Sequence, residues 1–368
     1  MTRFRPTVAE IDLDAVRHNV RTLKPARAEL LAVVKADGYG HGDVQVARAA
    51  LHAGASRIGV ALVEEGVRLR DHGVSAPILV LSEFPPGSEK EALTAGLTPS
   101  VYTPEGLAGL ADASEALDRA VGVHLKLDTG MHRVGLWPPA EAPAFARKVV
   151  DAGLVLEGLW THFALAEDDP EATRAQLKLL LEARDALARE GIRPTFVHAA
   201  NSAATIGLPE THLDLVRPGI ALYGLDPGGG LGPGTGLRAA LTWRSSVAMV
   251  KRLTAGERVS YGWRYELERD AMMATVPVGY DDGYRRELGG KADVLIGGRR
   301  HRVAGVVTMD QLLVDCGDAE VASGDEVVLI GAQGDECITA EELAGRTRTI
   351  GYEIVTSIGA RVPREYLH

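Results

Sequence analysis

Cysteine and lysine are both scarce in this chain of 368 residues. Cys316 and Cys337 are the only cysteines, so the chain has no C-x-x-C pair and no disulfide framework. Lysine accounts for eight of the 40 basic residues, so arginine supplies most of the positive charge. A lysine inside an otherwise apolar run is therefore a feature that needs an explanation.

Long apolar runs and an excess of positive charge are also absent. No stretch of about 18 apolar residues could span a bilayer, and the first residues lack the apolar core of a signal peptide. The formal net charge of −10 disfavours a general binder of nucleic acids or anionic membranes, because both would repel such a surface. No H-E-x-x-H motif or paired-histidine spacing predicts a metal. We expect a cytoplasmic protein without metal, nucleic-acid or membrane partners.

The first two-thirds of the chain repeat one theme, in which a short apolar run is followed by a turn and a helical pattern. This alternation predicts parallel βαβ units. Eight units over roughly 220 residues favour an α/β fold of the (β/α)8, TIM-like barrel type over an open doubly wound sheet. The predicted barrel covers residues 1–232. Its expected strands lie at 30–34, 57–61, 77–81, 97–101, 121–127, 155–160, 195–199 and 213–216, and helical patterns at 44–53, 63–71, 140–151 and 173–189.

The pattern changes after Tyr223, where residues 226–236 are rich in Gly and Pro and predict a linker. Short alternating runs then predict a smaller, mostly antiparallel β domain over residues 233–368. One helix at 339–346 interrupts it, with Thr339 as N-cap and Glu342 at the capping-box position. Residues 1–11 have an alternative assignment, in which a strand at 7–11 pairs with this second domain instead of with the barrel. The expected strands of the domain lie at 241–250, 274–278, 293–296, 302–307, 312–314 and 325–330.

Polar residues gather where the predicted barrel strands end. Active sites of (β/α)8 barrels lie at the carboxyl ends of the strands, so we expect these side chains on one rim. The polar segments are 35–42, 128–133, 161–164, 201–202 and 217–220.

Lys35 is the side chain in this set that best indicates chemistry. It follows the apolar residues 32–34, where a lysine without a function would extend its charge to solvent. The glycines at 38, 40 and 42 allow the backbone to approach a ligand closely, and Tyr39 offers a hydroxyl to a phosphate. Desolvation lowers the pKa of an amine, so a lysine in this setting can condense with an aldehyde.

The segment AVVKADGYGHG at 32–42 resembles the pyridoxal-phosphate attachment motif of alanine racemases. The resemblance runs nearly from end to end, and its motifs are specific in combination. It implies a barrel followed by a β domain, pyridoxal 5'-phosphate as the cofactor and a homodimer with shared active sites. The reaction that it implies is the interconversion of L-alanine and D-alanine, which supplies D-alanine for peptidoglycan. The other matching segments lie at 125–135, 161–164, 201–204, 216–224, 259–262, 275–286, 308–311 and 351–354.

The resemblance also implies the bases of the reaction. Lys35 would hold the cofactor as an aldimine and move the α-proton on one face of the substrate. Tyr261, supplied by the partner subunit, would move it on the opposite face, because a planar carbanion must be reprotonated from the other side. A tyrosine titrates near pH ~10, and His162 with Arg217 resembles the family's relay behind that tyrosine. Arg217 would also face the pyridine nitrogen, where it makes the ring a weaker electron sink than an Asp would.

The contacts of cofactor and substrate follow from the same resemblance. Arg133 and the backbone amide of Met309 from the second subunit would bind the substrate carboxylate. Lys126 matches a position that can be carbamylated, where the added negative charge orients the arginine. The phosphate would be held by Tyr39, Ser202, the backbone amides of Gly219 and Ile220, which open a helix, and Tyr352.

Four other functions stay open at this point. A racemase of broader range, for example one acting on serine, shares the fold, but such relatives carry signal peptides. A decarboxylase of related fold would want an acidic residue near the ring nitrogen and a reactive cysteine. A non-catalytic carrier of pyridoxal phosphate would resemble the barrel alone. A metal hydrolase would need histidine ligand spacing that the sequence lacks.

Overall fold

The computed structural model describes residues 4–232 and 234–368. The first residues of the predicted barrel range and residue 233, in the predicted linker, lie outside the described part. The chain forms two compact units. The barrel unit comprises Ala15–Gly38 and Asp43–Arg238, and the β unit comprises the chain up to Asp14, Tyr39–Gly42 and Ala239–His368.

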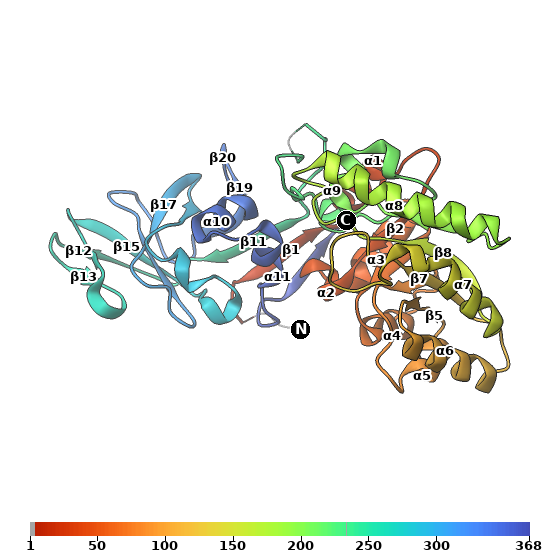
Figure 1. Ribbon diagram of the computed structural model, residues 1–368. Helices are drawn as coiled ribbons and strands as arrows, with labels where there is room; N and C mark the ends of the chain where they lie inside the picture. Colours follow the sequence, from red (N-terminus) through yellow and green to blue (C-terminus); the bar gives the residue numbers. More distant parts are fainter. Residues whose placement is uncertain (1–3, 233) are drawn as a thin grey trace. The chain divides into compact units, whose positions relative to one another are not determined.

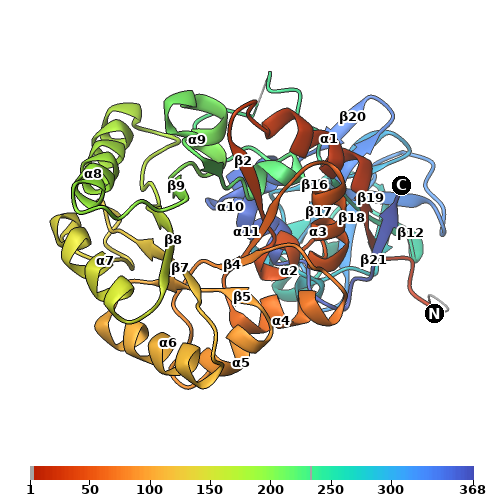
Figure 2. The ribbon, with the colours of Figure 1, turned by 90° about the vertical axis from the view of Figure 1, so that its right-hand side faces the viewer.

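The barrel unit contains a closed ring of parallel strands (Figures 1 and 2). Strands β5 and β6 belong to one predicted strand that is interrupted at Pro99, which has no N–H to donate. The ring closes where Asp214 N donates to Val197 O at 3.1 Å and Arg217 N donates to Ala200 O at 2.9 Å. In ring order the strands are β2 (Glu29–Val33), β3 (Arg57–Val60), β4 (Ile78–Val80), β5 (Leu97–Thr98), β6 (Ser100–Val101), β7 (Gly122–Lys126), β8 (Val155–Trp160), β9 (Phe196–His198) and β10 (Leu215–Val216).

These strands could be predicted from the sequence because parallel strands are covered on both faces and are therefore continuous apolar runs. Residues 30–34 are all buried, as a strand between the barrel interior and the outer helices must be. Figure 2 shows helices α4–α8 on the outside of the strands. The predicted α/β barrel fold is thereby confirmed. The helices are α1 (Leu13–Leu23), α3 (Asp43–His52), α4 (Val63–Asp71), α5 (Glu89–Thr94), α6 (Pro104–Ala116), α7 (Ala142–Asp151), α8 (Pro170–Arg189) and α9 (Ser202–Gly207).

Local sequence sets where two of these helices begin. Thr103 caps α6 by accepting a hydrogen bond from Gly106 N at 3.0 Å, and Asp169 caps α8 by accepting from Glu171 N and Ala172 N. A proline stands at the first position of both helices, where its missing N–H costs nothing. No helix in residues 4–232 and 234–368 is long and apolar enough to cross a membrane.

The β unit is built on one large, mostly antiparallel sheet, also as predicted. The run predicted at 241–250 is two strands, β11 and β12. Strand β1 pairs antiparallel with β11 and parallel with β21, so the chain's first strand belongs to this sheet. In sheet order the strands are β12 (Met249–Leu253), β15 (Ala271–Val276), β18 (Leu312–Asp315), β17 (Arg299–Ala304), β16 (Asp293–Ile296), β19 (Glu326–Gln333), β11 (Leu241–Ser246), β1 (Val8–Asp12) and β21 (Arg364–Leu367), with β20 (Glu336–Ile338) beside β19 and a separate hairpin of β13 (Arg258–Val259) and β14 (Tyr265–Glu266).

Two helices accompany this sheet, α10 (Ala340–Thr347) and α11 (Gly351–Thr356). Thr339 caps α10 as predicted, since its hydroxyl accepts a hydrogen bond from Glu342 N at 3.1 Å. The Glu342 carboxylate accepts from Arg300 Nη1 at 2.7 Å. Glu342 therefore ties the helix to β17, a use that its capping-box position did not indicate.

Candidate active site

The chain makes a left-handed turn directly after the first barrel strand. Ala36 (φ 53°, ψ 51°), Asp37 (φ 51°, ψ 49°) and Gly38 (φ 62°, ψ 42°) are all left-handed, and this turn is α2 (Lys35–Tyr39). For non-glycine residues this conformation costs roughly 1–2 kcal/mol each. Strain of this kind concentrates at functional sites, where the surrounding structure holds it in place. The turn begins at Lys35.

Lys35 belongs to a group of cationic side chains in the barrel unit. Burial is the largest cause that lowers the pKa of Lys35, the charge of Arg133 lowers it further, and Glu65 opposes both. Lys126, only 3% exposed, has its pKa lowered to about 7 by burial and then by Arg133 and Arg217. The structure thus brings together Lys35, Lys126, Arg133 and Arg217, and it lowers the pKa of both lysine amines.

Removing the Lys126 charge should stabilise the protein in a pH-dependent way. The folded pKa of about 7 lies below the ordinary value of 10.5, so the cost of burying the charged amine is full below pH 7 and vanishes above pH 10.5. We expect Lys126→Met to raise the melting temperature more at pH 6 than at pH 9, in carbonate-free buffer without added cofactor. The exposed Lys178 serves as control, and Lys178→Met should show no such difference. An equal effect of Lys126→Met at both pH values would contradict the placement of a buried, titrating amine.

Arg217 is held rigidly inside the barrel. One of its Nη atoms donates to the carbonyls of Thr161 at 2.8 Å and Ala199 at 2.9 Å, and the other donates to His198 Nδ1 at 2.9 Å. Its guanidinium carbon lies 4.8 Å from the centre of the Trp160 ring. Burial lowers the pKa of Arg217 to about 9, so the side chain stays charged at neutral pH.

Two buried histidines behind Arg217 were not singled out from the sequence. His198 accepts from Arg217 through Nδ1, so its Nε2 carries the proton and donates to His124 Nδ1 at 2.9 Å. Burial lowers the pKa of His198, and lowers that of His124 to about 3. His198 also stacks on Trp160 at 5.5 Å between ring centres. The neutral pair therefore fixes the orientation of Arg217. Of the two, only His198 lies at the end of a barrel strand, which is where a search of the sequence for site residues could have found it.

His162 follows β8 and carries no charge at neutral pH. Burial and then the charges of Arg217, Lys126, Arg133 and Lys35 lower its pKa well below the usual value. A neutral imidazole can accept a proton at one nitrogen and donate one at the other.

Ser202 and Gly219 lie together at another part of the same rim. The Ser202 hydroxyl accepts hydrogen bonds from Gly219 N at 2.9 Å and from Ala221 N at 3.3 Å. Ser202 begins α9, and Ile220 begins a short 3₁₀ turn, Ile220–Tyr223. The Gly219 and Ala221 amides thus donate to Ser202 in this structure, and the Ser202 hydroxyl has a proton of its own to donate to an anion.

In the β unit, the ring centres of Tyr39 and Tyr352 lie 6.1 Å apart, and the ring planes are tilted by 56°. The neighbouring glycines have a structural use. A Cβ on Gly40 would overlap the Val355 carbonyl, and one on Gly42 would overlap the Tyr366 hydroxyl. The expectation that these two glycines admit a ligand is not supported, because the space beside them is filled by the chain itself.

Tyr261 and Met309 lie on exposed loops of the β unit. Tyr261 is 72% exposed and lines a cavity of about 430 Å³ together with Ser260, Thr308 and Gln311. Met309 is 51% exposed, and Gly279 packs so closely on its carbonyl that a Cβ would not fit. Tyr261 and the loop that carries Met309 thus border one hollow.

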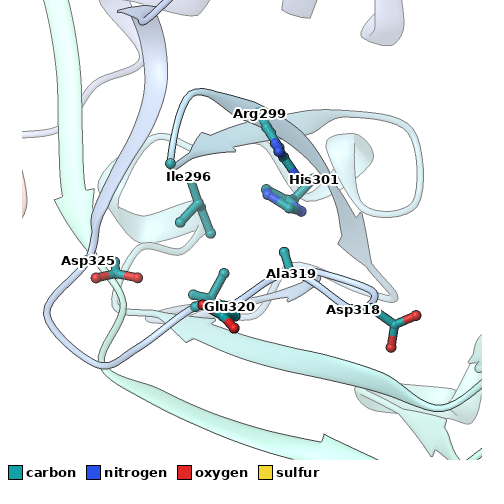
Figure 3. A pocket seen from close by; sticks show the side chains of 9 residues that line it. Ile296, Arg299, His301, Asp318, Ala319, Glu320 and Asp325 are labelled. Atoms are coloured by element: carbon teal, nitrogen blue, oxygen red, sulfur yellow. The ribbon is translucent and has the colours of Figure 1, made fainter.

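A second cavity of the β unit, about 400 Å³ in volume, contains none of the predicted site residues (Figure 3). Arg299 and His301 on β17 form one wall, and Asp318 and Glu320 form the other. These side chains are polar, but their mixed charges indicate no particular ligand.

The chain is similar to alanine racemases over its whole length. Residues 11–227 match the family model described as "Alanine racemase, N-terminal domain", and residues 240–366 match "Alanine racemase, C-terminal domain". Alanine racemase of Symbiobacterium thermophilum is 51% identical over 99% of this chain and 97% of its own length. That of Carboxydothermus hydrogenoformans is 42% identical over 99% of this chain and 100% of its own.

Solved structures agree with these similarities. Alanine racemase from D-cycloserine-producing Streptomyces lavendulae has a TM-score of 0.95 at 42% identity, covering 100% of this chain and 98% of that one. Alanine racemase from Bacillus anthracis with bound L-Ala-P has a TM-score of 0.94 at 38% identity, covering 100% and 96%. With both domain models and full-length relatives in agreement, the chain belongs to the alanine racemase family.

Proposed function

We propose that this protein interconverts L-alanine and D-alanine by moving the α-proton between two bases, Lys35 and Tyr261. The observation that carries the proposal is Lys35 itself. Its amine stands at the start of a strained left-handed turn, and burial and Arg133 lower its pKa. Family membership supplies the substrate, since the relatives bear the name alanine racemase.

The residues of the barrel rim fit pyridoxal 5'-phosphate. Lys35 offers an amine whose pKa is lowered, and the charge of the surroundings is positive. Ser202 and the Ile220 amide would donate to a phosphate, and the Gly219 amide, which donates to Ser202 in this structure, would turn to it as well. Tyr39 and Tyr352 would add hydroxyls to the phosphate, and Arg217 would face the ring nitrogen. When bound, this cofactor withdraws electrons from the α-carbon of the amino acid and so makes its proton acidic.

Two bases on opposite faces account for racemisation. We assign one face to the Lys35 amine and the other to the Tyr261 hydroxyl of the second subunit. Tyr261 needs a group that takes or returns its proton, and the neutral His162 with the fixed Arg217 suits that relay. Because Arg217 stays charged, it would not keep the ring nitrogen protonated as an Asp carboxylate would, and the cofactor would be a weaker electron sink.

Arg133 and Lys126 would set the substrate's position. The exposed Arg133 guanidinium suits a carboxylate, which it can bind through two parallel hydrogen bonds, and the Met309 amide of the second subunit would add another donor. A Lys126 amine with a pKa of about 7 is partly neutral at physiological pH, which is the state that reacts with CO2. We propose that Lys126 is carbamylated and that its negative charge then orients Arg133. Native mass spectra that show no added CO2 would contradict this modification.

We propose a homodimer because the β unit exposes large side chains beside Tyr261. Trp263 is 69% exposed, Tyr261 72% and Met309 51%, which is unusual for groups that face only water. A second copy would cover these side chains and receive Tyr261 and Met309 in its own site. The cytoplasmic location and the supply of D-alanine for peptidoglycan are part of the same proposal and rest on the family resemblance.

Mixing two inactive variants should restore activity if the sites are shared. In a random mixture of Lys35→Ala and Tyr261→Phe subunits, half of the dimers are hybrids, and each hybrid has one intact site. We therefore expect about a quarter of the wild-type activity after subunit exchange, with dimers confirmed by sedimentation velocity. The Lys35→Ala, Tyr261→Phe double variant mixed with wild type is the control, since its hybrids contain no intact site. Inactive hybrids would mean that Tyr261 does not act across subunits.

The function is tested by the optical rotation of an L-alanine solution with the purified protein and pyridoxal phosphate. Decay of the rotation to zero, faster for alanine than for serine, is the expected result. A faster reaction with serine would favour the broader racemase, and bound cofactor without any decay would favour a carrier. The match of residues 240–366 to the racemase C-terminal domain already disfavours a carrier that has the barrel alone.

A further inference from the structure

One carboxylate, that of Glu65 on α4, contacts the left-handed turn after Lys35. Its Oε1 accepts a hydrogen bond from Ala36 N at 2.7 Å. Its Oε2 accepts from Ala61 N at 2.8 Å and from Leu62 N at 3.1 Å. Ala36 follows β2, whereas Ala61 and Leu62 follow β3, so Glu65 joins the carboxyl ends of two neighbouring barrel strands.

The contacts of Oε2 alone would be an ordinary helix cap, since Leu62 is the N-cap of α4 and Glu65 stands three residues later. The contact of Oε1 is different, because its partner, Ala36, lies 29 residues from Glu65 along the chain. It reaches the first left-handed residue of the strained turn, directly after Lys35. A hydrogen bond to a charged acceptor is among the strongest that a backbone N–H can make.

Charged and polar groups also hold Asp37, the next residue of the turn. The Asp37 carboxylate accepts from Asp43 N at 3.2 Å and pairs with Arg68 at 3.2 Å. Arg68 lies one helical turn after Glu65 on α4. Helix α4 therefore holds the turn at two successive residues, Ala36 through Glu65 and Asp37 through Arg68.

We propose that Glu65 is a positioning residue that holds Ala36 in its left-handed conformation, directs Lys35 to the barrel rim and keeps a negative charge beside its amine. The proposal deepens the function assigned to Lys35 and rests on it. Two charged groups shift the pKa of Lys35, namely Glu65, which raises it, and Arg133, which lowers it. The charge of Lys35 in turn lowers the pKa values of Lys126 and His162. Glu65 is the only anion among these groups in the described residues.

The test uses the full chain freed of cofactor, so it does not depend on racemase activity. In Glu65→Gln the amide can accept through one oxygen only, and its NH2 group faces the donors that the other oxygen served. We expect hydrogen exchange at the Ala36 amide to become about ten-fold faster or more, as the loss of a hydrogen bond to a charged group implies. We also expect the midpoint of Lys35 acylation against pH, read by peptide mass spectrometry, to move to lower pH. Glu64→Gln, at an exposed neighbour on the same helix, should change neither.

A shorter carboxylate separates the two effects. Glu65→Asp keeps the charge but shortens the reach to Ala36, so exchange at Ala36 should accelerate while the Lys35 midpoint stays close to that of the wild type. Unchanged Ala36 exchange in Glu65→Gln would overturn the proposal. Faster exchange with an unchanged Lys35 midpoint would also overturn it, since Glu65 would then be a local cap. Either failure is distinct from failure of the proposed function, which is judged by racemisation in the wild type.

Discussion

Lys35→Ala should abolish both racemisation and the firm retention of pyridoxal phosphate. The variant loses a positioned base, which by itself is worth about 10²–10⁴-fold in rate, and also the amine to which the cofactor would attach. Activity is measured by optical rotation of alanine, and attachment by reductive trapping followed by mass spectrometry of the peptide that contains residue 35. We expect the trapped cofactor on Lys35 in the wild type and none in the variant.

Lys178→Ala is the matched control, because Lys178 is an exposed lysine on α8. It should retain both activity and cofactor. The circular dichroism melt of Lys35→Ala should remain cooperative, which separates a lost amine from a lost fold. Cofactor trapped on Lys126 instead of Lys35, the other amine with a lowered pKa, would contradict the assignment.

Tyr261→Phe should lower the rate of racemisation by about 10²–10⁴-fold, the contribution of one positioned acid–base group. The loss must fall equally on kcat/KM in both directions, because the two enantiomers have the same free energy. One half of the reaction should survive, since Lys35 still serves its own face. We therefore expect that in D2O one enantiomer of alanine still exchanges its α-proton and the other does not, as followed by proton NMR.

Tyr102→Phe, which removes a hydroxyl from a tyrosine of the barrel unit, should leave racemisation unchanged. If Tyr261→Phe exchanged the α-protons of both enantiomers at the wild-type rate, Tyr261 would not be the second base. Loss of exchange for both enantiomers would instead indicate that the variant disrupts binding, which the KM for alanine would reveal.

The barrel strands could be predicted because each is a short apolar run bounded by turn residues. The fourth predicted strand, 97–101, was the exception, since Pro99 divides it into β5 and β6. The single run at 241–250 was also divided, into β11 and β12, although it contains no proline. Apolar periodicity finds where a strand lies, but it does not show where its ladder of hydrogen bonds is interrupted.

The site could be predicted only in part, for reasons that differ from residue to residue. Lys35 stood out as a lysine after an apolar run. Glu65 did not, because an acidic residue in the first turn of a helix is ordinary, and its contact with Ala36 comes from the fold. The left-handed turn was also hidden, since neither Ala36 nor Asp37 is a glycine. His124 and His198 read as parts of strands, and only their contact with Arg217 gives them a purpose.

The most direct measurement is the deuterium content of D-alanine formed from L-alanine by the wild-type protein in D2O. Two bases that exchange with solvent predict that the first D-alanine to appear carries deuterium at the α-carbon, while the remaining L-alanine is still largely protiated. D-alanine that keeps its original proton would show that one group carries the proton across, contrary to the separate roles of Lys35 and Tyr261. If no D-alanine formed with cofactor present, racemisation itself would be ruled out.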